Sequence, residues 1–189
     1  MKISLEEIVK LSKKDLIGKV VVFPTDTVYG IGSLWDDFEG INKIYSLKNR
    51  DGKKPLAVLI DDFKQIEEYI DIVNERTVEL ISTYWPGDVT FIFKKKDSFN
   101  YPLETIAFRI PNSSTARSIL RKFGPMSTTS VNYSGEDPIN NIEEISTLFN
   151  NQIDYLVTND ESFSAVSSTI VDLTTKQMKI LRQGQKIIK

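Results

Sequence analysis

The chain of 189 residues contains neither histidine nor cysteine. Their absence excludes Cys nucleophiles, Ser-His-Asp triads, His general bases and zinc sites made from His and Cys. It also excludes disulfide bonds. Any catalysis must therefore use Lys, Arg, hydroxyl, Asn or carboxylate side chains and backbone amides. Such a set suits the positioning and charge stabilisation of phosphates, with Mg²⁺ as the expected metal.

Strong net charge and long apolar runs are also lacking. The formal net charge is −2, which is too small to indicate a dedicated nucleic-acid binder. No apolar run is long enough to span a membrane, and residues 1–16 lack the apolar core of a signal peptide. We therefore expect a cytoplasmic protein without membrane association. The length and the hydrophobic fraction of 40% predict one globular domain over residues 1–189.

Apolar patterning predicts an alternation of strands and helices. Short β-branched or aromatic runs predict buried strands at residues 20–23, 56–60, 89–93, 107–110 and 155–158, and a terminal hairpin of 168–172 with 178–181. Helical spacing predicts helices at residues 3–16, 37–47, 62–70, 74–84, 113–122 and 142–149, whereas residues 126–130 lead into a turn. The alternation indicates the α/β class, and the hairpin indicates a mixed sheet and not a purely parallel one.

Two polar segments in the first third of the chain are candidates for ligand binding. Residues 24–32 place hydroxyls, one carboxylate and two glycines directly after a strand, where open α/β sheets bind ligands. Residues 43–54 contain five basic residues against one acid, Asp51, and clustered cations can hold a triphosphate. The alternatives are a polar turn for the first segment and a solvated charged loop for the second.

Three later segments each offer groups that bind anions. Arg109 lies inside an apolar strand, where it could bind a substrate carboxylate or pair with a core acid. Residues 127–135 are rich in Ser, Asn and Gly, and could form an anion-binding nest or an ordinary turn. Hydroxyls at residues 167–169 open one strand of the terminal hairpin and Arg182 closes the other. A plain exposed hairpin edge is the alternative there.

In order and spacing, these segments resemble the YrdC-like family of threonylcarbamoyl-AMP synthases. The resemblance rests on PTDTVYGIG, KNR…KPL, WPGDVTFIF, AFRIP, STTSVNYSG, SSTIVD and LRQG, which run from about Val20 to Gly184. It implies a twisted, open mixed α/β sheet with flanking helices and a concave basic face. Because the chain ends just after LRQG, we expect the single-domain form of the family.

The resemblance also implies a reaction. L-threonine, bicarbonate and ATP would give threonylcarbamoyl-AMP and pyrophosphate, with Mg²⁺ accompanying ATP. The product would pass to the tRNA threonylcarbamoyl transferase machinery that modifies adenosine 37 of tRNA, and a direct tRNA contact is a further expectation. Two alternatives stay open. One is a module of the same fold that binds double-stranded RNA or tRNA, and the other is a carbamoyl-handling paralogue with another acceptor.

Individual residues receive roles from the same resemblance. It implies catalytic groups at Lys48, Arg50, Ser130 and Asn132, ATP contacts at Arg50, Lys54, Thr105, Ser130 and Arg182, and threonine contacts at Thr27, Arg109, Thr128 and Ser168, with no metal ligand from the protein. The positions that depart from the family's pattern are Asp51, Leu59, Asp88 and Val131. Asp51 would place a carboxylate beside the phosphates, and would either weaken ATP binding or help to recruit metal.

Overall fold

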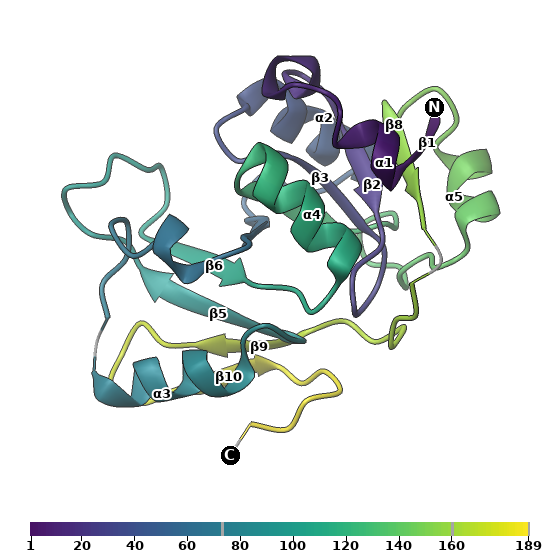
Figure 1. Cartoon of the computed structure of the whole chain (residues 1–189). Helices are drawn as coiled ribbons and strands as arrows, with labels where there is room; N and C mark the ends of the chain where they lie inside the picture. The colour runs from purple at the N-terminus through teal and green to yellow at the C-terminus, as the bar shows by residue number, and fades with distance from the viewer. Residues whose placement is uncertain (73, 160, 189) are drawn as a thin grey trace.

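The centre of the molecule is a ten-stranded mixed sheet. It is seen in a computed structural model that describes residues 1–72, 74–159 and 161–188. The strand order is β1-β8-β2-β3-β7-β4-β6-β5-β9-β10. Parallel neighbours such as β1 with β8 occur beside antiparallel ones such as β2 with β3. Figure 1 shows the sheet passing from β1 and β8 near the N-terminus to β9 and β10 near the C-terminus. The predicted α/β class with a mixed sheet is confirmed.

Most elements lie where the sequence predicts them. The strands are β1 (Lys2–Ser4), β2 (Val21–Phe23), β3 (Gly30–Leu34), β4 (Ala57–Leu59), β5 (Val89–Lys94), β6 (Thr105–Arg109), β7 (Met126–Ser130), β8 (Tyr155–Thr158), β9 (Thr169–Asp172) and β10 (Lys179–Arg182). The helices are α1 (Leu5–Ile8), α2 (Phe38–Lys48), α3 (Glu75–Tyr84), α4 (Ser114–Phe123) and α5 (Ile142–Leu148), with 3-10 turns η1 (Lys13–Leu16) and η2 (Phe63–Gln65). Asp37, Asn74, Ser113 and Asn141 each accept a backbone N–H at the start of the helix that follows, which stabilises those four starts.

Two predicted helices were wrong. The helix expected over residues 3–16 is divided into β1, α1 and η1, because Ser4 and Ser12 each begin a capping box of their own. A second cap inside the apolar pattern ends one turn and starts another. The helix expected over residues 62–70 is reduced to η2. There the side-chain oxygen of Gln65 accepts the N–H groups of Asp61 and Asp62, and so closes a single turn.

Two central strands were not predicted. β7 lies between β3 and β4, in a segment that was expected to lead into a turn. β3 begins inside the glycine-containing segment that follows the first strand and pairs with β2 and β7. The predicted terminal hairpin is confirmed, since β9 and β10 pair in antiparallel fashion.

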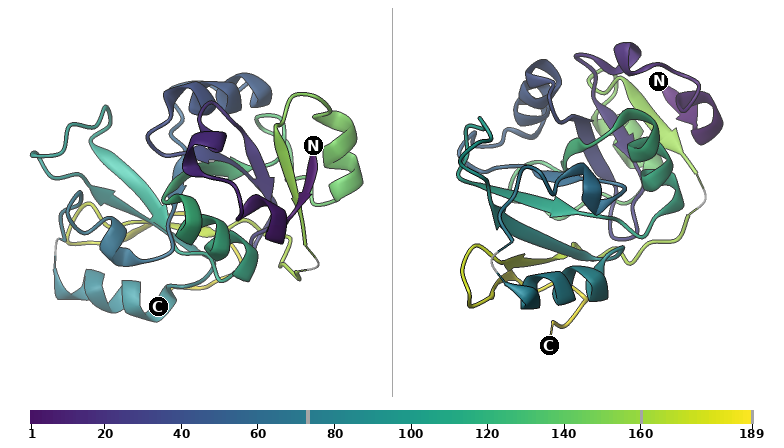
Figure 2. Two further views of the ribbon diagram at one scale, coloured as in Figure 1. Left: turned by 45° about the horizontal axis from the view of Figure 1, so that its top comes forward. Right: turned by 60° about the vertical axis from the view of Figure 1, so that its left-hand side comes forward.

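Helices cover both faces of the sheet (Figures 1 and 2). α1 and α4 pack against the face that carries Val21 and Phe23. α2 and α5 pack against the opposite face, which carries Val20 and Val22. α3 closes a third apolar cluster around the buried Phe91. No helix in the described ranges is both long and apolar enough to cross a lipid bilayer.

Candidate active site

Polar residues from several strands meet on the face of the sheet that α4 partly covers. Strand register pairs Thr128 with Ala57, and Arg109 with Leu59. Residues that pair in register, or lie two apart in one strand, point to the same face. Thr128, Ser130 and Arg109 therefore share a face. α4 covers Leu59 there, so the polar groups lie beside this helix.

A tight turn after β2 presents Asp26 and Thr27 to Arg109. The Thr25 hydroxyl accepts the N–H groups of Thr27 at 3.2 Å and Val28 at 3.3 Å, and donates to the Val28 carbonyl at 2.7 Å. This side-chain-to-backbone bonding is the mechanism by which Thr stabilises a turn. The segment is thus a polar turn, as one alternative proposed, and it also delivers two side chains to the site.

Arg109 is only 5% exposed and bonds to three groups. Its Nε donates to the Gly87 carbonyl at 2.9 Å, its Nη1 donates to the Thr27 hydroxyl at 2.8 Å, and its Nη2 pairs with the Asp26 carboxylate. Burial lowers the pKa of Arg109, and the charges of Asp26 and then Asp88 oppose this shift. The ion pair with an acid, one of the two alternatives for Arg109, is therefore present, with Asp26 as the partner. Since guanidinium has five N–H groups, two remain without an acceptor among the described residues.

Arg182 lies beside Arg109 without an acidic partner. Its Nε and Nη2 donate to the Ser168 carbonyl at 3.0 and 2.9 Å, and Nη2 also reaches the Ser168 hydroxyl at 3.2 Å. The hydroxyls of Ser168 and Thr90 are 2.8 Å apart. Burial, and then the charge of Arg109, lowers the pKa of Arg182. In the described part of the chain no carboxylate forms an ion pair with Arg182, so this corner carries uncompensated positive charge.

Lys48, at the end of α2, is 1% exposed and holds the end of β7. Its Nζ donates to the Ser130 carbonyl, and to the carbonyl and side-chain oxygens of Asn132, both at 2.8 Å. Asn132 also accepts the Ser130 hydroxyl at 2.6 Å and donates to the carbonyls of Tyr133 and Glu136. Burial, and then the charge of Arg50, lowers the pKa of Lys48 to about 8. Because all three N–H groups of an ammonium are used, Lys48 fixes the position of Ser130 and Asn132.

Arg50 borders the same cluster from an exposed loop. Its Nε and Nη2 donate to the carbonyls of Lys54 and Pro55, at 3.1 and 3.0 Å. The Asp51 carboxylate accepts the Lys53 N–H at 2.9 Å. Asp51 therefore folds the turn of the loop and forms no ion pair with Arg50 among the residues described. Lys54 itself is exposed.

Thr128 covers the two glycines of β3. A Cβ atom added to Gly30 would lie 2.9 Å from the Thr128 methyl group, and one added to Gly32 would lie 2.8 Å from its hydroxyl. The hydroxyl donates to the Met126 carbonyl at 3.0 Å. The close approach of β7 therefore leaves no room for a side chain at either position.

Some candidate residues stand apart from these clusters. Thr105, the exposed first residue of β6, pairs with Lys94. Among the residues that the structure describes, no hydrogen bond joins Thr105 to Arg50 or Arg182. Leu59 and Val131, two of the departures, are buried core residues. Thr90, whose hydroxyl contacts that of Ser168, was not among the predicted site residues. Its position three residues after the Pro86–Gly87 turn, at the start of a strand, was the sequence feature that could have indicated it. Across the described ranges, no group of three acidic side chains could hold a metal ion.

Comparison with known proteins identifies the family of the chain. A family model named Sua5_yciO_yrdC and described as "Telomere recombination" matches residues 16–184. A Mycobacterium tuberculosis protein, provisionally named a threonylcarbamoyl-AMP synthase, is 32% identical over 171 residues, which are 88% of this chain and 79% of that protein.

Solved structures show that the chain has a known fold. Sua5 of P. abyssi, determined in complex with L-threonine, superposes with a TM-score of 0.83 at 28% identity, over 94% of this chain. The chain spans about half of that longer protein, 53% of its length. E. coli YciO has the same fold, with a TM-score of 0.84 at 24% identity, over 98% of this chain and 91% of its own. With nearly its whole length matched by the family model, the chain belongs to the Sua5/YciO/YrdC family.

Proposed function

We propose that this protein is a threonylcarbamoyl-AMP synthase, which converts L-threonine, bicarbonate and ATP into threonylcarbamoyl-AMP and pyrophosphate. One observation carries the proposal. Three cations of the candidate site, Lys48, Arg50 and Arg182, have no carboxylate partner in the described part of the chain. Partly desolvated positive charge without a counter-ion favours a polyanionic ligand such as a triphosphate.

The chemistry needs no nucleophile from the protein. Bicarbonate and the amino group of threonine give N-carboxythreonine. A carboxylate oxygen of that carbamate attacks the α-phosphorus of ATP, the bond from this phosphorus to the bridging oxygen breaks, and pyrophosphate leaves with the electron pair. Negative charge gathers on the phosphoryl oxygens, where fixed cations lower the barrier. A chain without His or Cys is equipped for such a reaction.

Each cluster then has a distinct task. The two N–H groups of Arg109 that lack acceptors bind the threonine carboxylate, in the bidentate manner that guanidinium favours. The hydroxyls of Thr27 and Ser168 lie beside Arg109 and Arg182 and contact the rest of the amino acid. The solved complex of P. abyssi Sua5 with L-threonine supports an amino-acid site in this fold.

Arg50 and Arg182 bind the phosphates of ATP, and Ser130, Lys54 and Thr105 make further contacts to the nucleotide. The guanidinium of Arg50 forms no ion pair with a carboxylate among the described residues, so its charge is available to a phosphate. Lys48 acts as a positioning residue, because its three N–H groups are all used to shape the end of β7. Its charge adds to the local positive potential without direct contact.

Mg²⁺ enters this scheme as part of the substrate. The described residues do not bring three acidic side chains together. Their arrangement therefore does not fit a metal ion held by the protein itself. Mg²⁺ prefers to bind through substrate phosphates with few protein ligands. The adenylate product is proposed to pass to a tRNA threonylcarbamoyl transferase.

Pyrophosphate release tests the proposal. Protein, Mg²⁺ and ATP are incubated with L-threonine and bicarbonate together, with each alone, and with L-serine in place of threonine. We expect release only when threonine and bicarbonate are both present, and a loss of release in Arg182→Ala. Release driven equally well by serine would favour a paralogue with another acceptor. No release by folded protein would contradict the proposal.

A further inference from the structure

A cavity lies at the far end of β3 and β7 from Ser130. Its volume is about 520 Å³, within the range of small-ligand pockets. Gly30 pairs with Ser130 at one end of the two strands, whereas the Trp35 N–H bonds to the Pro125 carbonyl at the other. Five residues of strand separate the two places, which is about 16 Å at ~3.3 Å per residue. The cavity is therefore distinct from the candidate active site.

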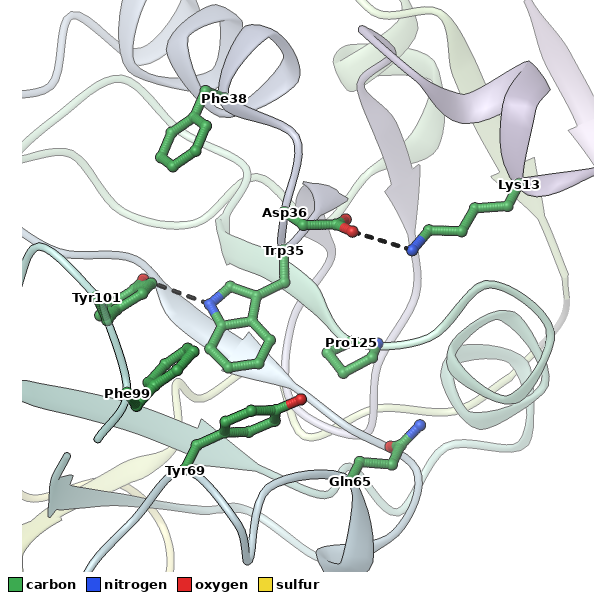
Figure 3. A pocket seen from close by; sticks show the side chains of 9 residues that line it. All are labelled: Lys13, Trp35, Asp36, Phe38, Gln65, Tyr69, Phe99, Tyr101 and Pro125. Carbon is green, nitrogen blue, oxygen red and sulfur yellow. Dashed lines mark hydrogen bonds and ion pairs between the residues drawn. The ribbon is translucent and has the colours of Figure 1, made fainter. Parts of the chain in front are cut away.

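One side of this cavity is a fixed aromatic platform (Figure 3). The indole N–H of Trp35 donates to the Tyr101 hydroxyl at 3.3 Å. The indole also contacts the ring of buried Phe108 edge-on, with 5.6 Å between the ring centroids. Phe99 stacks on Tyr101 with 9° between the ring planes and also contacts Tyr69. These contacts fix the rings before any ligand arrives, so little conformational entropy is lost on binding.

A further aromatic side chain of the lining is left unpaired. Phe38, the first residue of α2, is 67% exposed. Its ring contacts no other aromatic ring among the described residues. Figure 3 shows it projecting from the start of α2 on the same side of the cavity as Tyr101. A single exposed apolar ring is common on a protein surface, but this one lines the cavity and is therefore available to a ligand.

The opposite rim is polar. Lys13 and Asp36 form an ion pair at 3.2 Å, and their side chains are 54% and 73% exposed. Such exposed pairs contribute little to stability, so they can exchange partners readily. Gln65 uses its amide oxygen for two backbone N–H groups. Its NH₂ group has no acceptor among the described residues and is available as a donor.

We propose that this cavity binds a nucleobase, either of a free nucleoside or of a single strand of RNA. Every base offers a flat π-face, which suits the platform of Trp35 and the free ring of Phe38. Every base also has an edge with both donors and acceptors. That edge matches the ammonium of Lys13, the carboxylate of Asp36 and the amide of Gln65.

Tryptophan fluorescence can report this binding without any assay of catalysis. The chain has two tryptophans, and Trp85 is buried, with its indole N–H bonded to the Val89 carbonyl. Adenosine and an octaadenylate RNA are titrated separately, with and without saturating ATP. The bound base is expected to quench the fluorescence of Trp35, and this quenching should be absent in Trp35→Phe. Phe38→Ala is expected to weaken binding by about tenfold, the scale of one stacked base. Lys13→Ala is expected to weaken it by about two- to tenfold, the scale of one hydrogen bond.

Two matched controls remove similar groups elsewhere. Lys14→Ala deletes the neighbouring exposed cation, and Val78→Ala trims an exposed apolar side chain on α3; both should bind as the wild type does. Quenching by adenosine identifies a free nucleoside, whereas quenching by octaadenylate alone identifies a base carried by RNA. Absence of quenching in folded protein, quenching that Phe38→Ala leaves unchanged, or quenching that ATP abolishes would overturn the proposal.

Discussion

The pair of Asp26 and Arg109 permits a quantitative test of the site's architecture. Their side chains are 15% and 6% exposed. Arg109→Ala would leave the Asp26 carboxylate without its cation. It would also remove the two N–H groups that donate to the Thr27 hydroxyl and to the Gly87 carbonyl. Removing one partner of a buried pair costs about 3–5 kcal/mol, because an uncompensated charge is left behind. Removing both partners leaves no such charge. We therefore expect Arg109→Ala and Asp26→Ala together to cost at least about 2 kcal/mol less than the sum of the two single changes.

Urea unfolding, followed by circular dichroism, measures the four free energies of this cycle. The exposed pair of Lys2 and Glu143 is a matched control, because its atoms are 2.7 Å apart and its side chains are 42% and 75% exposed. Its coupling should stay below about 1 kcal/mol, as exposed pairs generally show. A coupling below about 1 kcal/mol for Asp26 and Arg109 would refute the view that this pair is the buried electrostatic centre of the site.

Three further expectations address the loop, the buried lysine and the packing of α2. Arg50→Ala should leave the free energy of urea unfolding within about 0.5 kcal/mol, since Arg50 is bonded to carbonyls of its own loop and to the nearby Tyr45 at a partly exposed position. The same change should raise the KM for ATP by about tenfold, as one lost charge-assisted bond implies; an unchanged KM would remove Arg50 from the phosphate site. Lys48 has a pKa of about 8 when folded and 10.5 as its ordinary value, so the unfolded chain binds more protons between these values. The stability of the wild type relative to Lys48→Met should thus rise as the pH increases from about 8 towards 10.5, and urea curves with a constant difference across that window would contradict the burial of its charge. A Cβ atom added to Gly40 would lie 1.9 Å from the Ser33 Oγ, so Gly40→Ala should lower the free energy of unfolding by about 1–3 kcal/mol, measured by heat or urea. Gly52 has open space around it, so Gly52→Ala should leave this free energy nearly unchanged. Equal effects of the two substitutions would contradict the packing of α2 on β3.

Local composition was sufficient for some strands and misleading for others. β2 and β5 consist mainly of β-branched and aromatic residues, and both were predicted. β7 has the sequence MSTTS and β3 has the sequence GIGSL, neither of which is typical of a buried strand. They are strands because each has a hydrogen-bonded neighbour on both sides, and that context is tertiary.

The N-terminal segment shows the limit of periodicity. Its apolar spacing is helical, and residues 3–16 were expected to form one helix. The spacing identified the buried positions well, since Ile3, Ile8 and Leu16 all join one cluster. Periodicity alone could not show that Ser12 would start a second capped turn.

The sequence indicated which residues carry the chemistry, but not how they are paired. Arg109 stood out because a charged residue interrupted an apolar strand. Its partner Asp26 lies 83 residues away in the chain, and Lys48 meets Asn132 across 84 residues. Such distances lie beyond any local pattern. The resemblance to a known family brought these segments together, whereas the complete burial of Lys48 became apparent only from the packed structure.

The roles of the site residues and the concave basic face stay predictions, and one measurement bears on the central claim most directly. Protein, Mg²⁺, ATP and L-threonine are incubated with ¹³C-bicarbonate, and the nucleotide products are resolved by mass spectrometry. We expect an adenylate that contains threonine and one ¹³C atom, absent when threonine is omitted and strongly reduced in Arg182→Ala. Pyrophosphate or AMP without that labelled adenylate, or no product from folded protein, would contradict the assignment of threonylcarbamoyl-AMP synthesis to this site.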